Sequence, residues 1–513
     1  MYYLLFLINR KYFHILIIYM FFSLCYLDTR ASELRLSTAI QQSLKQNPDI
    51  QIQNTQIAVA QGQYLQAAGQ FDWVLSSGLL YDKKVTPQVN SADGLLINSG
   101  YQLGMSKQLH NGMSLNGSLD ALASDGQLLQ QNRLKFDLSL IVPLLHGRDA
   151  TASSEDVAKL NIELSRYQLR DRIAQTLYNT LLAYWTYRSR VDLEKVAQSS
   201  EERSQSLLRS IQKLVDAGEK PRADLVLLQA DHSDKISRRQ AAALARIEAR
   251  TVLGRLLGLD ELAIRQLPEP SDTLPAQLTT LPLFSTAAIS TAALQQRPDV
   301  RALAVQLDAA RRQMQAVQER LKPQLDLQLG LGYAKASEGG SRYGFAAEAG
   351  QIQASPSVFA RLNYQFPLQN NSASGAMQER SALLSQLLIR QKDLNIGVAS
   401  GVESAWQALF NSSEQLKEAK QALAWYELAV SQEVVKQKNG ISTLIDVINV
   451  ETRFVSARVN YLQLQLAYAS ALAKLRFETG TLLPAASSNI HDDEVVSLDV
   501  SDMAGLGPLT SFH

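Results

Sequence analysis

The residues with the clearest chemical pattern are two aspartates, each six positions after a glycine. Asp446 follows Gly440, and Asp224 follows Gly218 at a shift of 222 residues. At each glycine one helical pattern ends and another begins, so both glycines are predicted to form the tip turn of a helical hairpin. A carboxylate in the first turn of a helix also stabilises the helix dipole, and that structural interpretation of both aspartates stays open.

Other residue types that carry out chemistry show no organised spacing. The six histidines form no HExxH or other metal-binding pattern, and there is no Gly-x4-Gly-Lys-Ser/Thr phosphate loop. The carboxylates are scattered, without the paired context that acid–base catalysis needs. We therefore expect no enzyme, no metal site and no cofactor.

The composition is that of a folded protein with balanced charge. Of the 513 residues, 46% are hydrophobic and 19% charged, which provides enough apolar surface for a packed core. Lys and Arg number 50 against 49 Asp and Glu. A nucleic-acid-binding protein would usually show a basic excess, so no nucleic acid is expected as a partner.

Residues 1–31 are predicted to be a secretory signal peptide. Arg10-Lys11 precede an apolar run at 15–27, and Ala31 stands close to the expected cleavage site. An N-terminal membrane anchor is the alternative, although the run is short for a span. Cys25 is the only cysteine, so the processed chain would need no disulfide.

Two hydrophobic periods alternate along the remaining chain. Apolar spacings of three and four predict helices at 36–69 with a break at Asn47-Pro48, and at 151–215, 223–257, 285–321, 373–438 and 444–477. At 1.5 Å per residue, the two longest would each extend on the order of 100 Å. Helices of that length are typical of coiled-coil packing.

A period of two replaces the helical period inside each half. It predicts strands beginning near Phe71, Tyr101, Met113, Leu134, Leu325 and Val358. Strands with one apolar and one polar face fit either a sheet on a core or a membrane barrel with a polar lumen. Phe71, Trp73 and Tyr81 are candidates for an aromatic belt at a membrane interface or for core packing.

The chain is an internal duplication with an insertion in its first half. Arg297-Pro298-Asp299 echoes Asn47-Pro48-Asp49 at a shift of 250, whereas Pro367-Leu368 echoes Pro143-Leu144 at a shift of 224. The first half therefore carries additional residues before Pro143. The hairpin around 101–119, turned at His110-Asn111-Gly112, is the candidate insertion.

These patterns predict five segments. They are a signal peptide at 1–31, a first repeat at 32–258, a Pro-rich linker at 259–284, a second repeat at 285–483 and a disordered tail at 484–513. Four to six strands are too few to close a membrane barrel, which needs about eight, and lipid does not tolerate an open sheet edge. Either the strands pack on a soluble core, or several chains share one barrel.

Together, these features resemble the TolC-like outer-membrane efflux proteins. The resemblance rests on the paired Pro-Asp motifs, the two Pro-Leu junctions between strand and helix, and the two glycine–aspartate tips, and covers roughly 36–483. It implies an α+β membrane protein that forms a homotrimer. Three chains would build one transmembrane β-barrel in outer-membrane lipid, four strands each, and their helices a periplasmic α-barrel.

The resemblance also implies a function and a set of partners. The trimer would export small molecules or polypeptides across the periplasm and outer membrane, joined through a periplasmic adaptor (membrane fusion) protein to an inner-membrane transporter. The alternative is a periplasmic coiled-coil adaptor or scaffold without a pore. The duplicated order of strands, long helix and tip favours the channel, and the sequence does not indicate the cargo.

By the same resemblance, the helix tips form the constriction or gate, with Asp446, Asp224 and Asn449 as candidate residues. One Asp446 from each of three chains would make a ring of like charges, which attracts cations and raises the pKa of its members. Two positions depart from the family. Asn449 stands where members often carry an acid, and Ser442 where some carry an arginine, so the closure of this end stays open.

Overall fold

The computed structural model describes residues 33–86, 94–126, 130–145, 151–275, 286–338 and 353–483. The predicted signal peptide and C-terminal tail lie outside the described residues. The chain divides into two compact units. The helical unit consists of the described residues within 1–52, 170–297 and 396–513, and the sheet unit of those within 53–169 and 298–395.

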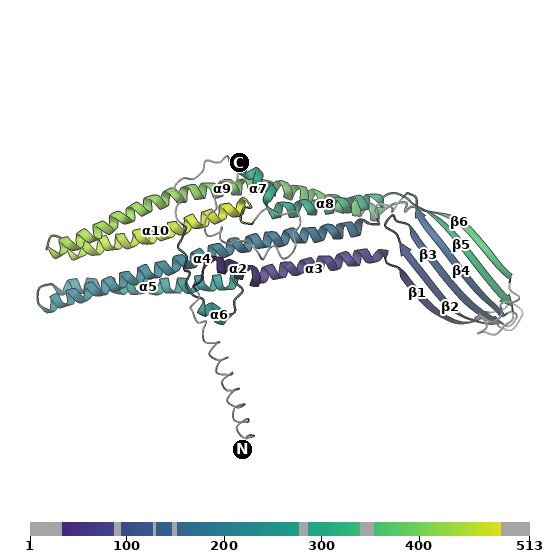
Figure 1. The fold of residues 1–513 in the computed structure, drawn as a ribbon, viewed down its shortest axis with the longest axis horizontal. Helices are drawn as coiled ribbons and strands as arrows, with labels where there is room; N and C mark the ends of the chain where they lie inside the picture. Colours follow the sequence, from purple (N-terminus) through teal and green to yellow (C-terminus); the bar gives the residue numbers. More distant parts are fainter. Residues whose placement is uncertain are drawn as a thin grey trace, which may run out of the picture. The chain divides into compact units, whose positions relative to one another are not determined.

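Helices account for most of the described chain (Figure 1). They are α2 (Leu36–Gln46), α3 (Pro48–Ala68), η1 (Gly69–Phe71), α4 (Ser153–Asp216), α5 (Arg222–Leu256), α6 (Glu261–Gln266), α7 (Thr286–Gln296), α8 (Pro298–Glu319), α9 (Asn371–Lys438) and α10 (Leu444–Glu478). Helices α4 and α9 have 64 and 68 residues, which correspond to about 96 and about 102 Å. Among the described helices, none has an apolar stretch long enough to cross a membrane.

Proline ends a helix in both repeats. Helix α2 stops before Pro48, as predicted, and α7 stops at Gln296, just before Pro298. The prediction of one unbroken helix over 285–321 is therefore wrong. A proline ring disfavours helical geometry in the residue before it, so the second repeat breaks where the first does.

One antiparallel sheet contains all the described strands (Figure 1). They are β1 (Val74–Thr86), β2 (Gly94–Gln108), β3 (Ser114–Gly126), β4 (Gln130–Pro143), β5 (Gln324–Glu338) and β6 (Gln353–Gln365), paired in chain order. The four strands per chain that the resemblance implies are therefore wrong for this protein, whose described residues already contain six. The additional pair is the β2–β3 hairpin, at the predicted insertion, and its turn includes Gly112 at φ 82°.

The sheet has one apolar and one polar face. Leu103, Leu119, Phe136 and Tyr333 pair across successive strands, so they form one apolar row on the same face. The row next to it, on the opposite face, holds Gln102, Asp120, Lys135 and Ala334. In the single chain the apolar face is exposed, up to 82% for Leu79 on β1.

The helical unit has a core of interdigitated helices. On α9 and α10, Leu409, Tyr468 and Leu475 are almost fully buried in one cluster. Part of the predicted linker is packed into this unit, because the Asp272 carboxylate accepts hydrogen bonds from the Leu36 N–H at 2.6 Å and the Tyr184 hydroxyl at 2.5 Å. Burial, with Asp272 adding to it, raises the pKa of Tyr184.

Candidate functional site at the helix tips

Both predicted tip glycines adopt the left-handed backbone that favours glycine. Gly218 has φ 81° and Gly440 φ 74°. The Gly440 N–H donates to the Gln437 carbonyl at 3.1 Å, and the Ile441 N–H donates to the Lys436 carbonyl at 2.9 Å. These bonds satisfy carbonyls at the end of α9, so the chain can reverse into α10 within a few residues.

The two hairpins of the helical unit pack together near their tips. Ile211 on α4, Leu228 on α5 and Leu444 on α10 share one buried cluster. A hydrogen-bonded ion pair also joins the two hairpins, in which Arg203 of α4 donates to Glu451 of α10 at 2.8 Å. The α4–α5 and α9–α10 hairpins are thus held side by side in this unit, which the ribbon also shows (Figure 1).

Asp446 forms a capping box at the start of α10. Its carboxylate accepts from the Thr443 N–H at 3.0 Å and the Thr443 hydroxyl at 2.5 Å, while the Asp446 N–H donates to Thr443 Oγ1 at 3.3 Å. The Thr443 hydroxyl and N–H hold the pKa of Asp446 below its usual value. The helix-capping interpretation is therefore satisfied, and the exposed carboxylate stays charged at neutral pH.

The other two candidate residues have different surroundings. Asn449 is exposed and lies three residues after Asp446, so the two share one face of α10. Asp224 is half-buried in the first turn of α5, and its N–H donates to the Pro221 carbonyl at 3.2 Å. Asp446 and Asn449 thus come from one hairpin and Asp224 from the other.

Sequence reasoning missed the residues that hold the tip together. The Ser442 hydroxyl donates to Glu433 of α9, and Lys436 Nζ lies 3.1 Å from the same carboxylate. Both interactions lower the pKa of Glu433, Ser442 most strongly. The Thr443-x-x-Asp446 spacing is a readable capping-box pattern, but no sequence signal connects Glu433 to Ser442, nine residues later.

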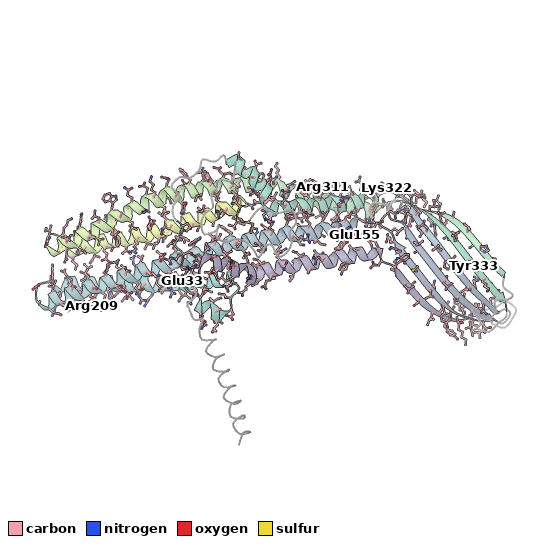
Figure 2. The ribbon with its side chains drawn as sticks, in the orientation of Figure 1. Glu33, Glu155, Arg209, Arg311, Lys322 and Tyr333 are labelled. Atoms are coloured by element: carbon pink, nitrogen blue, oxygen red, sulfur yellow. The ribbon has the colours of Figure 1, made fainter. Side chains whose placement is uncertain are left out.

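A second polar cluster lies in the sheet unit, around Glu155 near the start of α4 (Figure 2). Its side chain is 7% exposed and contacts Lys159 at 2.8 Å, His110 at 3.0 Å and the Tyr64 hydroxyl at 3.4 Å. The hydrogen bond from Lys159 is the main cause of a lowered Glu155 pKa. The cluster connects α3, the β2–β3 turn and α4.

The structure separates the three aromatic residues that were candidates for an interfacial belt. Phe71 is buried in η1 and stacks on His110 with ring centroids 3.9 Å apart, so its assignment to a strand is wrong and, of the two alternatives, core packing applies to it. Trp73 and Tyr81 are 51% and 72% exposed, so the prediction that they belong to a belt stays open. Among the described residues, no group of three or more His, Cys, Asp and Glu side chains could hold a metal ion.

Comparisons with known proteins match the second repeat to a family and most of the chain to a known fold. Residues 289–481, within the second repeat, match the sequence profile of the family described as "Outer membrane efflux protein". No curated protein sequence matches the chain significantly.

Solved outer-membrane channels share the fold over most of the chain. The CmeC channel of Campylobacter jejuni is 15% identical with a TM-score of 0.68, covering 90% of this chain and 89% of its own. VceC of Vibrio cholerae is 13% identical with a TM-score of 0.66, covering 87% and 96%. The open state of MtrE of Neisseria gonorrhoeae is 16% identical with a TM-score of 0.61, covering 87% and 89%.

The family and the fold together specify the location, an outer membrane from which the protein extends into the periplasm. The matched family and the fold are those of channel proteins and not of enzymes. Residues 289–481 thus match the outer-membrane efflux protein family, and the chain as a whole has the fold of the outer-membrane channels.

Proposed function

We propose that this protein is a homotrimeric channel-tunnel that exports small molecules or polypeptides. It works with a periplasmic adaptor (membrane fusion) protein and an inner-membrane transporter, which supplies the energy. The trimer's strands close one barrel in outer-membrane lipid, and its long helices form the periplasmic tunnel.

The open, two-faced sheet is the observation that carries this proposal. β1 and β6 are its edge strands, and its apolar face is exposed in the single chain. Lipid accepts an apolar face but not an unpaired edge, because every backbone polar group must be satisfied there. Pairing β6 of one chain with β1 of the next, around a closed ring, satisfies both edges.

The tip of the α9–α10 hairpin supports contact with a partner protein. Ile441 is 75% exposed and Ile445 is 56% exposed, and both lie within five residues of Gly440. Exposed apolar side chains grouped at a helix end favour docking against another helical surface. We assign this surface to the adaptor.

We also propose that Asp446 lines the periplasmic constriction, with Asn449 on the same helix face and Asp224 on the partner hairpin. Three copies of the Asp446 carboxylate around the axis attract cations. Repulsion among the three carboxylates raises the pKa of Asp446, whereas the hydrogen bonds from Thr443 within each chain lower it. Capping and gating are compatible roles, because capping uses the charged carboxylate.

Fractionation tests the channel against the pore-free adaptor. We expect the protein in detergent-extracted outer membrane, as trimers that resist SDS until heated. Purified trimers should conduct ions across a planar lipid bilayer. Recovery of the protein in the soluble periplasm, as a monomer without conductance, would establish the adaptor or scaffold instead.

The gate is tested with a matched pair of variants. Asp446→Asn removes the charge while keeping a side-chain acceptor for the cap, and Thr443→Val removes the cap hydroxyl while keeping the charge. We expect the cation-to-anion permeability ratio in planar bilayers to fall in Asp446→Asn and to stay at the wild-type value in Thr443→Val. Equal ratios in all three proteins would leave Asp446 with the capping role alone.

A further inference from the structure

The β2–β3 hairpin occupies the interior of the sheet. β1 pairs with β2 over 74–86, β2 pairs with β3 over 96–108, and β3 pairs with β4 over 114–125. A hairpin folded over one face, or projecting beyond the sheet, would leave β1 paired directly with β4. Here β1 and β4 are separated by two strands along their lengths.

The hairpin has the same two faces as its neighbours. Tyr101, Leu103 and Met105 alternate with polar or small residues along β2, and these three are 61%, 48% and 49% exposed. They lie in register with apolar residues of the adjacent strands, as in the pairs Met105–Leu75 and Leu103–Leu119. The apolar surface that faces lipid therefore continues across the hairpin.

The strands of the hairpin are long enough to cross a bilayer. β2 and β3 have 15 and 13 residues, as β5 and β6 do. A tilted transmembrane strand needs about 9–11 residues. Both added strands are therefore long enough to be complete transmembrane strands of a β-barrel.

The turn of the hairpin is fixed at the end of the sheet where the helices begin. Within the turn, the Leu109 N–H donates to Met113 at 2.8 Å and the Gly112 N–H donates to Leu109 at 2.9 Å. The His110 ring stacks on Phe71 and its Nε2 lies 3.0 Å from Glu155. The added strands are thus tied to η1 and α4.

We propose that the β2–β3 hairpin is part of the barrel wall in every chain, so that the trimer closes a barrel of eighteen strands. This inference rests on the proposed trimeric channel and departs from the twelve strands that four per chain would give. Because barrel diameter grows roughly linearly with strand number, the outer mouth becomes about 1.5-fold wider and its cross-section about 2.3-fold larger.

The polar face of the hairpin indicates what this mouth passes. Asn98, Gln102, Asn116 and Ser118 lie on the face opposite the apolar row, so in the closed barrel they line the lumen. Their amide and hydroxyl groups hydrogen-bond water and polar solutes. The hairpin therefore makes the outer mouth a wide, hydrated passage suited to bulky hydrophilic cargo.

Two measurements on the full-length protein test the inference. Images of the wild-type trimer in lipid nanodiscs, viewed along the barrel axis, should show eighteen strands. In planar bilayers, polyethylene glycols of increasing size are added on the outer side, and the largest polymer that still lowers the conductance reports the radius of the mouth. Excision of Gly94–Gly126 should reduce that cut-off radius about 1.5-fold.

A conducting wild-type trimer with twelve strands would overturn the inference while leaving the channel intact. An unchanged polymer cut-off after excision would do the same. If the excised variant does not fold, the strand count of the wild-type trimer decides alone. Failure of the proposed function would look different, because wild-type protein would then form no conducting trimer.

Discussion

His110 offers a direct way to measure how firmly the β2–β3 turn is held. His110→Ala removes the hydrogen bond to Glu155 and the stack on Phe71. Glu155 keeps Lys159 and Tyr64 as partners, so the substitution leaves no buried charge unpaired. The cost is therefore below the 3–5 kcal/mol typical of breaking a buried ion pair.

The contacts set the size of the expected effect. A hydrogen bond to a charged group contributes about 1.5–3 kcal/mol, and an aromatic stack about 0.5–1.5 kcal/mol. The His110 side chain is 65% exposed, which places both contributions at their lower ends. We expect the free energy of local opening of the turn to fall by about 2 kcal/mol, equivalent to roughly 30-fold faster amide exchange.

Hydrogen–deuterium exchange with mass spectrometry, on the purified trimer, reads this opening directly. The Leu109 and Gly112 amides, which donate within the turn, should exchange faster in His110→Ala. Asp156→Ala is the control, because the Asp156 side chain is 44% exposed and approaches Lys159 only to 3.9 Å. Equal exchange in the His110→Ala and Asp156→Ala proteins would refute the claim that His110 anchors the hairpin.

Three further predictions concern stability. The pKa of Glu155 is lower in the folded protein than the value of about 4.3 expected in the unfolded chain, so the charged carboxylate stabilises the fold at pH values above about 4.3. This stabilisation is lost as the pH falls through the pKa of the folded state. Glu155→Gln should thus lower the urea midpoint of unfolding at pH 7 but unfold at the same urea concentration as wild type in strong acid. Arg297→Ala should cost about 1.5–3 kcal/mol, measured as earlier loss of helical circular dichroism on heating, because the hydrogen bond from Arg297 to Glu478 is lost at a site only 12% and 11% exposed while Lys474, at 2.6 Å, keeps the Glu478 carboxylate paired; an unchanged transition would contradict this. Gly258→Ala should give less trimer in membrane extracts, because Gly258 has φ 70° and a Cβ there would collide with the Gln46 carbonyl. A wild-type yield of trimer would contradict the close packing of Gly258 against Gln46.

The repeating features of this protein were predictable, because they follow local rules. Period-two alternation predicted the strands, and the change in shift between the repeats located the β2–β3 insertion. The glycine–aspartate spacing predicted both tips, since a glycine at positive φ followed by an acid in the next helix turn is a local arrangement. Single tertiary contacts were not predictable. Glu155 meets His110 across 45 residues and Arg297 meets Glu478 across 181, and no periodicity encodes such pairs.

The number of strands in the wall shows where local rules stop. Alternation identifies Tyr101, Leu103 and Met105 as one face of a strand, but a hairpin lying over a sheet would alternate in the same way. Only the register, with Met105 opposite Leu75 and Leu119 opposite Phe136, decides that the hairpin lies inside the sheet. Because a trimer repeats each chain's strands three times, inserting one hairpin adds six strands to the ring. A local insertion that leaves the helices of both repeats in place can therefore widen the mouth without changing the tips.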